Sequence, residues 1–297
     1  MDSFAKKATN TLRRRASSLW ILVHWLRVHY SDPMPITEER VYEFAKWCAR
    51  ERRPATRVEG VVEAIGFARG VIGLENVDDT VASGRIRGSG HKQYMTKRQT
   101  RQAAALTRRM VGCLEQLAIN GSGPDQVLAG DACFCIHTRA RYSDAANIAQ
   151  EPFLDISVGE NGEQFGFVEA TADRVKTSGA KRKRRVPIPL VGMAIGFQDA
   201  PWAEEWLAAR MRHGLAADAD GCLFRAVGKD GSFAQRRRSS SDMGLWVREA
   251  LIKYGGYSPE DVQFITSHSL KDTQLCWLAK ACVKHGIRRL LLSLIHI

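Results

Sequence analysis

The stretch Leu154-Asp-Ile-Ser-Val-Gly-Glu-Asn-Gly-Glu-Gln-Phe-Gly-Phe167 decides the fold class, because its pattern differs from the rest of the chain. Apolar residues occupy alternate positions on both sides of an Asn-Gly pair, namely Leu154, Ile156, Val158, Phe165 and Phe167. A period of two around Asn-Gly predicts a β-hairpin. A third strand is expected at Arg185–Leu190, where Pro187 and Pro189 restrict it to an edge of the sheet.

Outward from this hairpin, apolar residues recur every three to four positions, which is typical of helices. Helices are expected after the hairpin at Trp202–Met211, Met243–Tyr254 and Ser269–His285. Before it, one helix runs from Leu106 to a stop at Asn120-Gly121, and another starts near Asp125. The sequence therefore predicts a mainly α fold with a small antiparallel β-sheet.

The first third of the chain is helical by its capping residues. Thr37 precedes Glu38 and an apolar stripe, which predicts a capped helix. Thr56-Arg-Val-Glu59 has the pattern of a capping box, and Gly73 lies where that second helix would stop. We expect a helical domain at 1–77.

From 78 to 98 the helical pattern disappears, and glycines alternate with arginines and lysines. This composition favours a basic linker, with a single long surface loop as the alternative. A second domain then occupies 99–291.

The charge of the chain indicates a polyanionic partner. Among 297 residues, 44 Lys and Arg against 32 Asp and Glu give 44 − 32 = +12. The content of 44% hydrophobic and 26% charged residues excludes a disordered tail, a collagen-like fibre and a coiled coil.

Membrane and secretory functions are not expected. The most apolar stretch, Leu19–Leu26, is much shorter than the ~20 residues of a membrane span. Arg13, Arg14 and Arg15 imitate the start of a signal peptide, but no small-residue cleavage site follows. The seven cysteines, an odd number, are interpreted as reduced thiols of a soluble cytosolic or nuclear protein.

Three short islands of polar residues interrupt the helices. The first is Thr138-Arg-Ala-Arg-Tyr-Ser-Asp144, where an apolar helix ends. An arginine at such an end is well placed to bind a phosphate through its two-pronged donor group, and Asp144 would orient it. A surface arginine without function is the alternative.

The second island is Lys176-Thr-Ser-Gly-Ala-Lys-Arg-Lys-Arg-Arg-Val-Pro-Ile188. Lysines at the tip of a hairpin can enter a DNA groove, and a basic run neutralises phosphates. A solvated turn and a nuclear-import peptide are the alternatives.

The third island is Thr266-Ser-His-Ser-Leu-Lys-Asp-Thr273, at the start of an apolar helix. His268 and Lys271 are three residues apart, so both can face one site beside the free amides of the helix start. A capping or packing histidine is the alternative.

Cys133-x-Cys135-x-His137 raises the question of a metal site. No second ligand pair lies at zinc spacing, so buried thiols are favoured. No nucleotide-binding glycine motif is present either, and we expect neither a metal nor another cofactor.

Taken in order, these three islands behind a helical domain resemble the tyrosine recombinases (phage integrase family). The chain looks most like a divergent branch in mobile elements of protists, in which His-Ser-Leu-Lys replaces His-x-Leu-Arg. The resemblance implies a core-binding domain at 1–77 and a catalytic domain at 99–291. It also implies DNA breakage and rejoining through a 3′-phosphotyrosine, on double-stranded DNA and as a homotetramer when the protein is full length.

The resemblance also assigns roles to residues. Arg141 would stabilise the developing charge, and Lys271 would replace the family's second arginine. Lys176 or Lys181 would protonate the leaving oxygen, and His268 would transfer a proton. Further DNA contacts would come from Arg139, Lys181, Arg182, Lys183, Arg184 and Arg185.

Two departures from the family pattern are visible. Lys271 lacks the bidentate fork of arginine. No tyrosine follows Tyr257, so the chain as given lacks its nucleophile. Leu292-Ser-Leu-Ile-His-Ile297 looks like translated sequencing adaptor, from which we expect a truncated reading frame with a non-native tail at 292–297. The alternative to a nuclear (or, in a prokaryote, nucleoid) recombinase is a non-catalytic, basic DNA-binding module derived from one.

Overall fold

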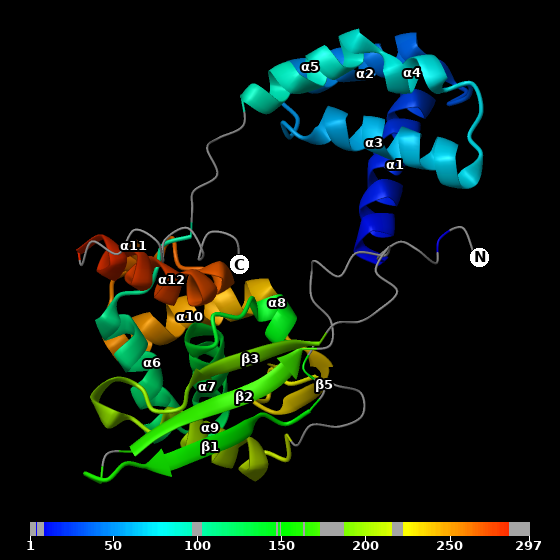
Figure 1. The fold of residues 1–297 in the computed structure, drawn as a ribbon. Helices are drawn as coiled ribbons and strands as arrows, with labels where there is room; N and C mark the ends of the chain where they lie inside the picture. The colour runs from blue at the N-terminus through cyan, green and yellow to red at the C-terminus, as the bar shows by residue number, and fades with distance from the viewer. Residues whose placement is uncertain are drawn as a thin grey trace. The chain divides into compact units, whose positions relative to one another are not determined.

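The chain divides into two compact units, Met1–Thr100 and Arg101–Ile297 (Figure 1). The computed structural model describes residues 4, 9–96, 103–146, 148, 150–162, 164–172, 187–215 and 222–284. Each unit has its own hydrophobic core.

All regular secondary structure among the described residues of unit 1 is helical. Its elements are α1 (Thr9–Tyr30), α2 (Glu38–Arg50), α3 (Arg57–Ile72), α4 (Asp78–Ala82) and α5 (Gly84–Met95). Apolar stripes on these helices meet in one core, whose fully buried members include Leu22, Leu26, Phe44, Ile65 and Ile86. Burial of such side chains stabilises a fold by about 1.5–3 kcal/mol each.

The helix ends of unit 1 match the sequence in part. The Thr37 hydroxyl accepts a hydrogen bond from Arg40 N, and Gly73 ends α3 in the left-handed conformation, with φ of 77°. Both features confirm the prediction. The capping box at Thr56 is wrong, because Thr56 has ψ of 6° rather than the extended backbone of an N-cap, and its side chain makes no capping bond.

The prediction of a linker over 78–98 is also wrong for its described residues, which form α4 and α5. The Ser83 hydroxyl caps α5 by accepting from Ile86 N, and the Ile86 side chain is fully buried. Gly90 lets α5 approach α3, since a Cβ there would lie 3.3 Å from Val58. Gln93 donates from Nε2 to the buried Ala45 carbonyl at 3.0 Å. Lys97 and Arg98 lie outside the described residues.

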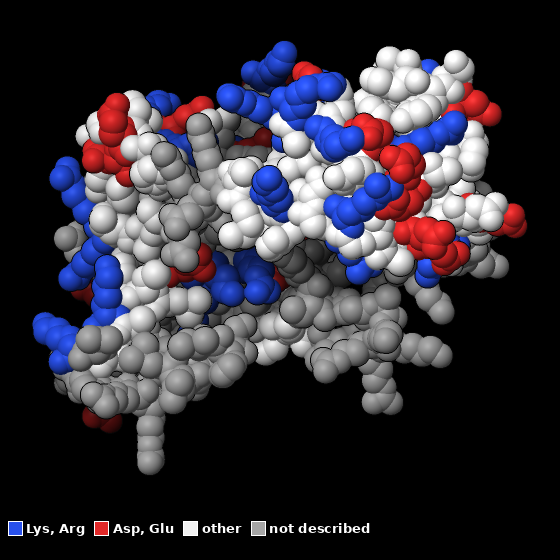
Figure 2. Space-filling model, turned by 90° about the horizontal axis from the view of Figure 1, so that it is seen from above, with Lys and Arg blue, Asp and Glu red and all other residues white. Residues whose placement is uncertain are grey.

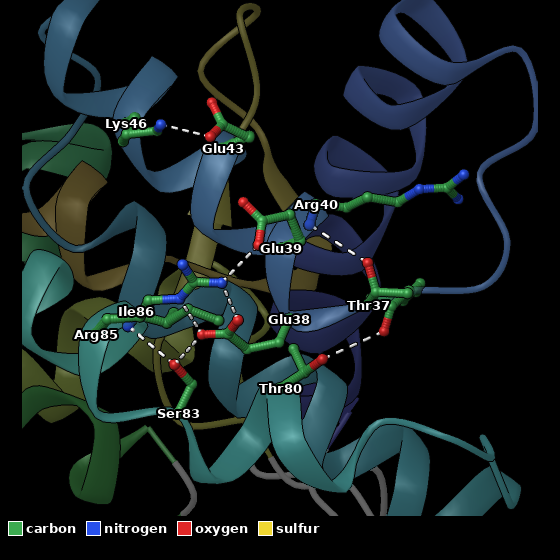
Figure 3. A network of polar contacts seen from close by, with 11 residues as sticks. Thr37, Glu38, Glu39, Arg40, Glu43, Lys46, Thr80, Ser83, Arg85 and Ile86 are labelled. Atoms are coloured by element: carbon green, nitrogen blue, oxygen red, sulfur yellow. Dashed lines mark hydrogen bonds and ion pairs between the residues drawn. The ribbon is translucent and has the colours of Figure 1, made fainter.

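Polar contacts fix the start of α5 to the start of α2 (Figure 3). Arg85 forms ion pairs with Glu38 and Glu39, and the Ser83 hydroxyl donates to Glu38 at 2.6 Å. The hydrogen bond from Arg85 lowers the pKa of Glu38 to about 2. Arg85 therefore holds α5 against α2.

Unit 2 combines helices with two small sheets. Its helices are α6 (Arg108–Asn120), α7 (Gly123–His137), α8 (Tyr142–Ala145), α9 (Trp202–Arg212), α10 (Ser240–Gly255), α11 (Pro259–Val262) and α12 (Ser267–Lys284), with a short 3-10 helix η2 (Phe197–Asp199). Its strands are β1 (Phe153–Val158), β2 (Gln164–Ala172), β3 (Ile188–Met193), β4 (Arg225–Val227) and β5 (Phe233–Arg237). The helix α7 is buried from Gln126 to its end and forms the centre of the core. The mainly α fold with a small antiparallel sheet is confirmed.

The three-stranded sheet has the order β1-β2-β3 with antiparallel pairing, and α7 and α9 lie behind it (Figure 1). The hairpin prediction is confirmed, and the predicted third strand is an edge strand that begins at Ile188. The register pairs Ser157 with Phe165 and Asp155 with Phe167. Both phenylalanines therefore face away from the side of the sheet that carries Leu154 and Val168. The hairpin β4-β5 has no counterpart in the sequence predictions.

None of the described helices is long and apolar enough to cross a bilayer. All seven cysteines are free, as expected for reduced thiols. Four of them, Cys48, Cys133, Cys135 and Cys282, are buried.

Candidate functional site

The first polar island forms a break between α7 and α8. The Thr138 hydroxyl donates to the Phe134 carbonyl at 2.6 Å and ends α7, and Arg139 then takes a left-handed conformation with φ of 54°. Arg141 has extended backbone, with φ of −65° and ψ of 135°, and is the N-cap of α8. The turn places Arg141 outside both helices, as the sequence predicts for an arginine at a helix end.

This break borders a cavity of about 370 Å³ in unit 2. Residues of the helix break form one part of its wall, and β3 and α12 form the rest. Lys271 comes from the first turns of α12, which packs against α7 and α8 (Figure 1). The lining residues are Thr138, Arg139, Ala140, Arg141, Asp144, Ile188, Pro189, Leu190, Val191, Lys271 and Leu275. The fold thus brings the first and third islands to one cavity.

The cavity carries an excess of positive charge. Arg139, Arg141 and Lys271 line it, and Asp144 is the one acidic residue among the described residues of the lining. Arg141 Nη1 lies 3.6 Å from Asp144 Oδ2, which is an ion-pair distance but longer than a hydrogen bond. The Arg141 side chain is 35% exposed, whereas that of Asp144 is 11% exposed. Arg141 can therefore reach a ligand while the buried carboxylate holds its orientation.

His268 is placed differently from Lys271. It lies in the first turn of α12 with an exposed side chain, and it is not part of the cavity lining. The expected free amides at this helix start are partly used, because His268 N donates to Thr266 Oγ1 at 3.2 Å and Ser269 N donates to the Thr266 carbonyl at 3.0 Å. The structure brings Arg141 and Lys271 together but leaves His268 at the exposed end of α12.

A buried hydrogen-bonded chain lies behind the cavity and was not found from the sequence. His137 is stacked on Trp202, with ring centroids 5.1 Å apart. His137 Nε2 lies 2.9 Å from Glu115 Oε1, and its Nδ1 lies 3.2 Å from Gln274 Nε2. This chain joins α6, α7 and α12. The only signals in the sequence are a glutamate and a histidine inside otherwise apolar helical stripes.

A second set of buried contacts fixes the start of α12 to the segment before α6. The Thr273 hydroxyl accepts from Leu106 N at 2.9 Å and donates to the Ser269 carbonyl at 2.7 Å. Trp277 Nε1 donates to the Leu106 carbonyl at 3.2 Å. Lys271 is therefore presented by a helix whose following turns are fixed against α7 and against the segment before α6.

None of the six tyrosines of the chain, all of which lie in described segments, lines this cavity. Tyr142 follows Arg141 directly, but its ring is buried and stacks on Phe224 at 4.9 Å. Burial raises the pKa of Tyr142 well above its usual value, so the phenolate is disfavoured. Tyr142 is a packing residue.

The second island cannot be placed beside the other two. Its basic residues follow β2 and precede β3 in the sequence and lie outside the described residues. They are Lys176, Lys181, Arg182, Lys183, Arg184 and Arg185.

The thiols next to His137 are part of the core. Burial raises the pKa of both Cys133 and Cys135 well above the usual range for a thiol, which disfavours the thiolate that binds metals. Within the described residues, no group of three or more His, Cys, Asp or Glu side chains is arranged to hold a metal ion.

Unit 1 has a basic groove of its own, a hollow of about 770 Å³ along α2 and α5. Its basic lining residues are Lys46, Arg52, Arg53, Arg85 and Lys92, and none of the lining residues that the structure describes is acidic. Arg85 and Lys46 already pair with glutamates of α2 beside the groove. Figure 2 likewise shows Lys and Arg side chains interspersed with Asp and Glu. The cations of this groove that lie in no described ion pair are Arg52, Arg53 and Lys92.

No protein-family model matches the chain, and no curated protein matches its sequence.

Proposed function

We propose that this chain binds duplex DNA, and that the cavity around Arg141 and Lys271 is the phosphate site of a tyrosine-recombinase-type centre. One observation carries the proposal: Arg141 and Lys271, which are far apart in the sequence, line one cavity, and Asp144 is the single carboxylate among its described lining residues. A pocket with this excess of positive side chains favours an anionic ligand. The two-pronged guanidinium of Arg141 and the ammonium group of Lys271 can together bind the oxygens of a phosphodiester. The net charge of +12 provides long-range attraction to DNA.

In this proposal each side chain has a distinct role. Arg141 donates two hydrogen bonds to the non-bridging phosphate oxygens, and Lys271 adds a positive charge. Asp144 keeps Arg141 oriented. A lysine of the second island, Lys176 or Lys181, protonates the 5′-oxygen when the P–O5′ bond breaks, and His268, which lies outside the cavity lining, would serve proton transfer from the exposed start of α12. Tetramer formation on DNA and a nuclear location belong to the same proposal.

A second candidate is a DNA-binding module without strand cleavage. The observation in its favour is that no tyrosine lines the cavity. Cleavage requires a tyrosine oxygen to attack the phosphorus and become the 3′-phosphotyrosine, so the six tyrosines present do not supply this step in the described arrangement. Both candidates share the phosphate site and differ only in the nucleophile.

Salt-dependent binding to a labelled DNA duplex tests the shared site. We expect the affinity of the wild-type chain to fall at least tenfold between about 50 and 200 mM salt. Arg141→Ala and Lys271→Ala each reduce the slope of log K against log salt by about 1. The matched control is Lys229→Ala, which removes an exposed lysine outside the cavity. A flat salt response, or Arg141→Ala binding like the control, would refute the proposal.

Denaturing electrophoresis after incubation with DNA separates the two candidates. The non-catalytic module predicts no covalent protein–DNA adduct from this chain. An adduct that is lost in Arg141→Ala would instead establish an enzyme that uses one of the six tyrosines.

A further inference from the structure

One face of the three-stranded sheet is apolar and acidic, unlike the rest of this basic chain. The register places ten residues on it, all exposed, and we call this set the outer face: Phe153, Asp155, Ser157, Phe165, Phe167, Glu169, Thr171, Pro189, Val191 and Met193. Five are large and apolar, with Phe153 66% and Phe165 48% exposed. Phe167 pairs with Met193 on the neighbouring strand and follows Phe165 on the same face of β2, so these three apolar residues are contiguous. Contiguous exposed apolar residues mark interaction surfaces.

The charge of the outer face indicates the chemistry of its partner. Asp155 and Glu169 lie on it, and none of its ten positions holds Lys or Arg, although the chain has 44 of them. Neither carboxylate forms an ion pair with a described residue. DNA is excluded as the ligand of this face, because its phosphates would be repelled. A complementary partner combines apolar side chains with Lys or Arg.

Helix α1 has a surface of this kind. It contains no acidic residue, and its side away from the core carries exposed residues at helical spacing, which we call the α1 stripe: Arg13, Ser17, Trp20, His24, Arg27 and Val28. Trp20 is 62% and Val28 68% exposed. An apolar hollow of about 350 Å³ runs beside Trp20, His24 and Val28. The stripe therefore combines exposed apolar side chains with arginines, which is the chemistry that complements the outer face.

We propose that the outer face binds the α1 stripe of a second copy of this chain. The contact is heterologous, since each copy offers the face to one neighbour and the stripe to another, and it therefore builds a ring or an open filament. Face-to-face pairing of two sheets is disfavoured, because it would bring like carboxylates together. The contact needs no DNA, so it is independent of the proposed phosphate site.

The small area of the outer face predicts a low binding affinity. Three strands spaced about 4.8 Å apart give a face only ~10 Å wide. An interface much smaller than ~800 Å² per partner gives micromolar rather than nanomolar affinity. A concentration series of the full-length chain without DNA is therefore required, and sedimentation velocity provides it.

Reciprocal charge reversal tests both the face and its occupant. The face-reversed variant is Asp155→Arg with Glu169→Arg, and the helix-reversed variant is Arg13→Glu with Arg27→Glu. We expect the wild type to self-associate in the micromolar range and each variant alone to associate at least about tenfold more weakly. An equal mixture of the two variants regains wild-type affinity within about threefold, because both contacts in the mixture again join opposite charges.

Matched controls address folding and net charge. Val158→Arg adds a charge on the opposite side of the same sheet, and Arg14→Glu reverses a charge of α1 beside the stripe. Both controls should associate like the wild type, with unchanged circular dichroism. A wild type that stays monomeric, a helix-reversed variant that associates normally, or a mixture that stays dissociated would each overturn the proposal. The second of these results would point to sheet-to-sheet pairing.

Discussion

The cavity around Arg141 and Lys271 in unit 2 and the groove along α2 and α5 in unit 1 are both basic, but their cations are held differently. The cavity cations stand at helix ends that buried hydrogen bonds join through His137. In the groove, Arg53 lies over the Trp47 ring at 4.6 Å, and Arg85 is paired with glutamates at the surface. Similar positive charge is thus organised as a fixed site in the cavity and as a solvated surface in the groove. Only the cavity depends on a buried hydrogen-bond network.

Removal of Glu115 should have the largest effect on stability, because its carboxylate belongs to the buried network that the groove lacks. Glu115 is fully buried and accepts from Phe197 N at 2.9 Å as well as contacting His137. Glu115→Ala leaves both groups without a partner, and we expect unfolding to become about 3 kcal/mol easier. Urea unfolding measures this loss, and hydrogen exchange of α6 and α12 locates it. Glu51→Ala, which removes the exposed Arg50–Glu51 ion pair of unit 1, is the control and should change stability little. Equal losses of stability in the two variants would show that the buried network of unit 2 matters no more than a surface ion pair of unit 1.

Thr273→Val should have the next largest effect. The substitution keeps the shape of the side chain but removes the acceptor of Leu106 N, which then stays buried without a partner. We expect a loss of about 2 kcal/mol in the free energy of unfolding and faster hydrogen exchange at the start of α12. Thr37→Val, at the surface cap of α2, provides the reference. A variant as stable as the wild type would show that α12 is not anchored at this point.

The two units should also respond to pH in opposite directions. Burial raises the pKa of Asp131 in unit 2 to about 7, although Trp206 Nε1 donates to it. The folded state therefore holds a proton that the unfolded chain releases near pH 4, and stability falls as pH rises through 7. We expect a loss of about 1 kcal/mol between pH 6 and pH 8, absent in Asp131→Asn. In unit 1 the lowered pKa of Glu38 gives stability that is lost only as pH falls from its ordinary value toward about 2. A profile that rises between pH 6 and 8, or an unchanged profile in Asp131→Asn, would refute this assignment.

Substitutions in the groove of unit 1 should have the smallest effect. Arg53→Ala removes one solvated cation, and we expect less than about a threefold loss in DNA affinity at physiological salt. Arg85→Ala should do less still, because the glutamates beside it already neutralise its charge. Fluorescence anisotropy with the same duplex measures both variants. A loss at Arg53 larger than that at Arg141 would reverse the ranking of the two basic regions.

Local pattern predicts local structure well in this chain. The hairpin, the edge strand and the helix stop at Gly73 follow from alternation, proline and glycine, whose preferences act over a few residues. The sequence does not predict which face of the sheet carries Phe165 and Phe167. Apolar residues occupy both faces of the strands, and only packing against α7 selects the buried face. The sequence does not predict helix α5 for a related reason. Its glycines are typical of a linker, and only the packing of Gly90 against Val58 shows that a glycine is needed where two helices approach.

The candidate site shows the same limit. The position of Arg141 at a helix end follows from the sequence, since an apolar run stops there. The approach of Lys271 depends on α12 packing against α7 through His137 and Gln274, which are far apart in sequence. The same packing leaves His268 outside the cavity, although its spacing from Lys271 permits a shared site. Long-range hydrogen bonds, rather than motif spacing, decide which island residues meet.

A double-mutant cycle on Arg141 and Lys271 tests whether the two side chains bind one phosphate. The affinity for one DNA duplex is measured at fixed salt for the wild type, Arg141→Ala, Lys271→Ala and the double variant. If both cations bind one phosphate, the double variant loses less affinity than the product of the two single losses, by a coupling energy of at least ~0.5 kcal/mol. Single losses that multiply within error, or that match Lys229→Ala, would contradict the claim that one cavity binds one phosphate.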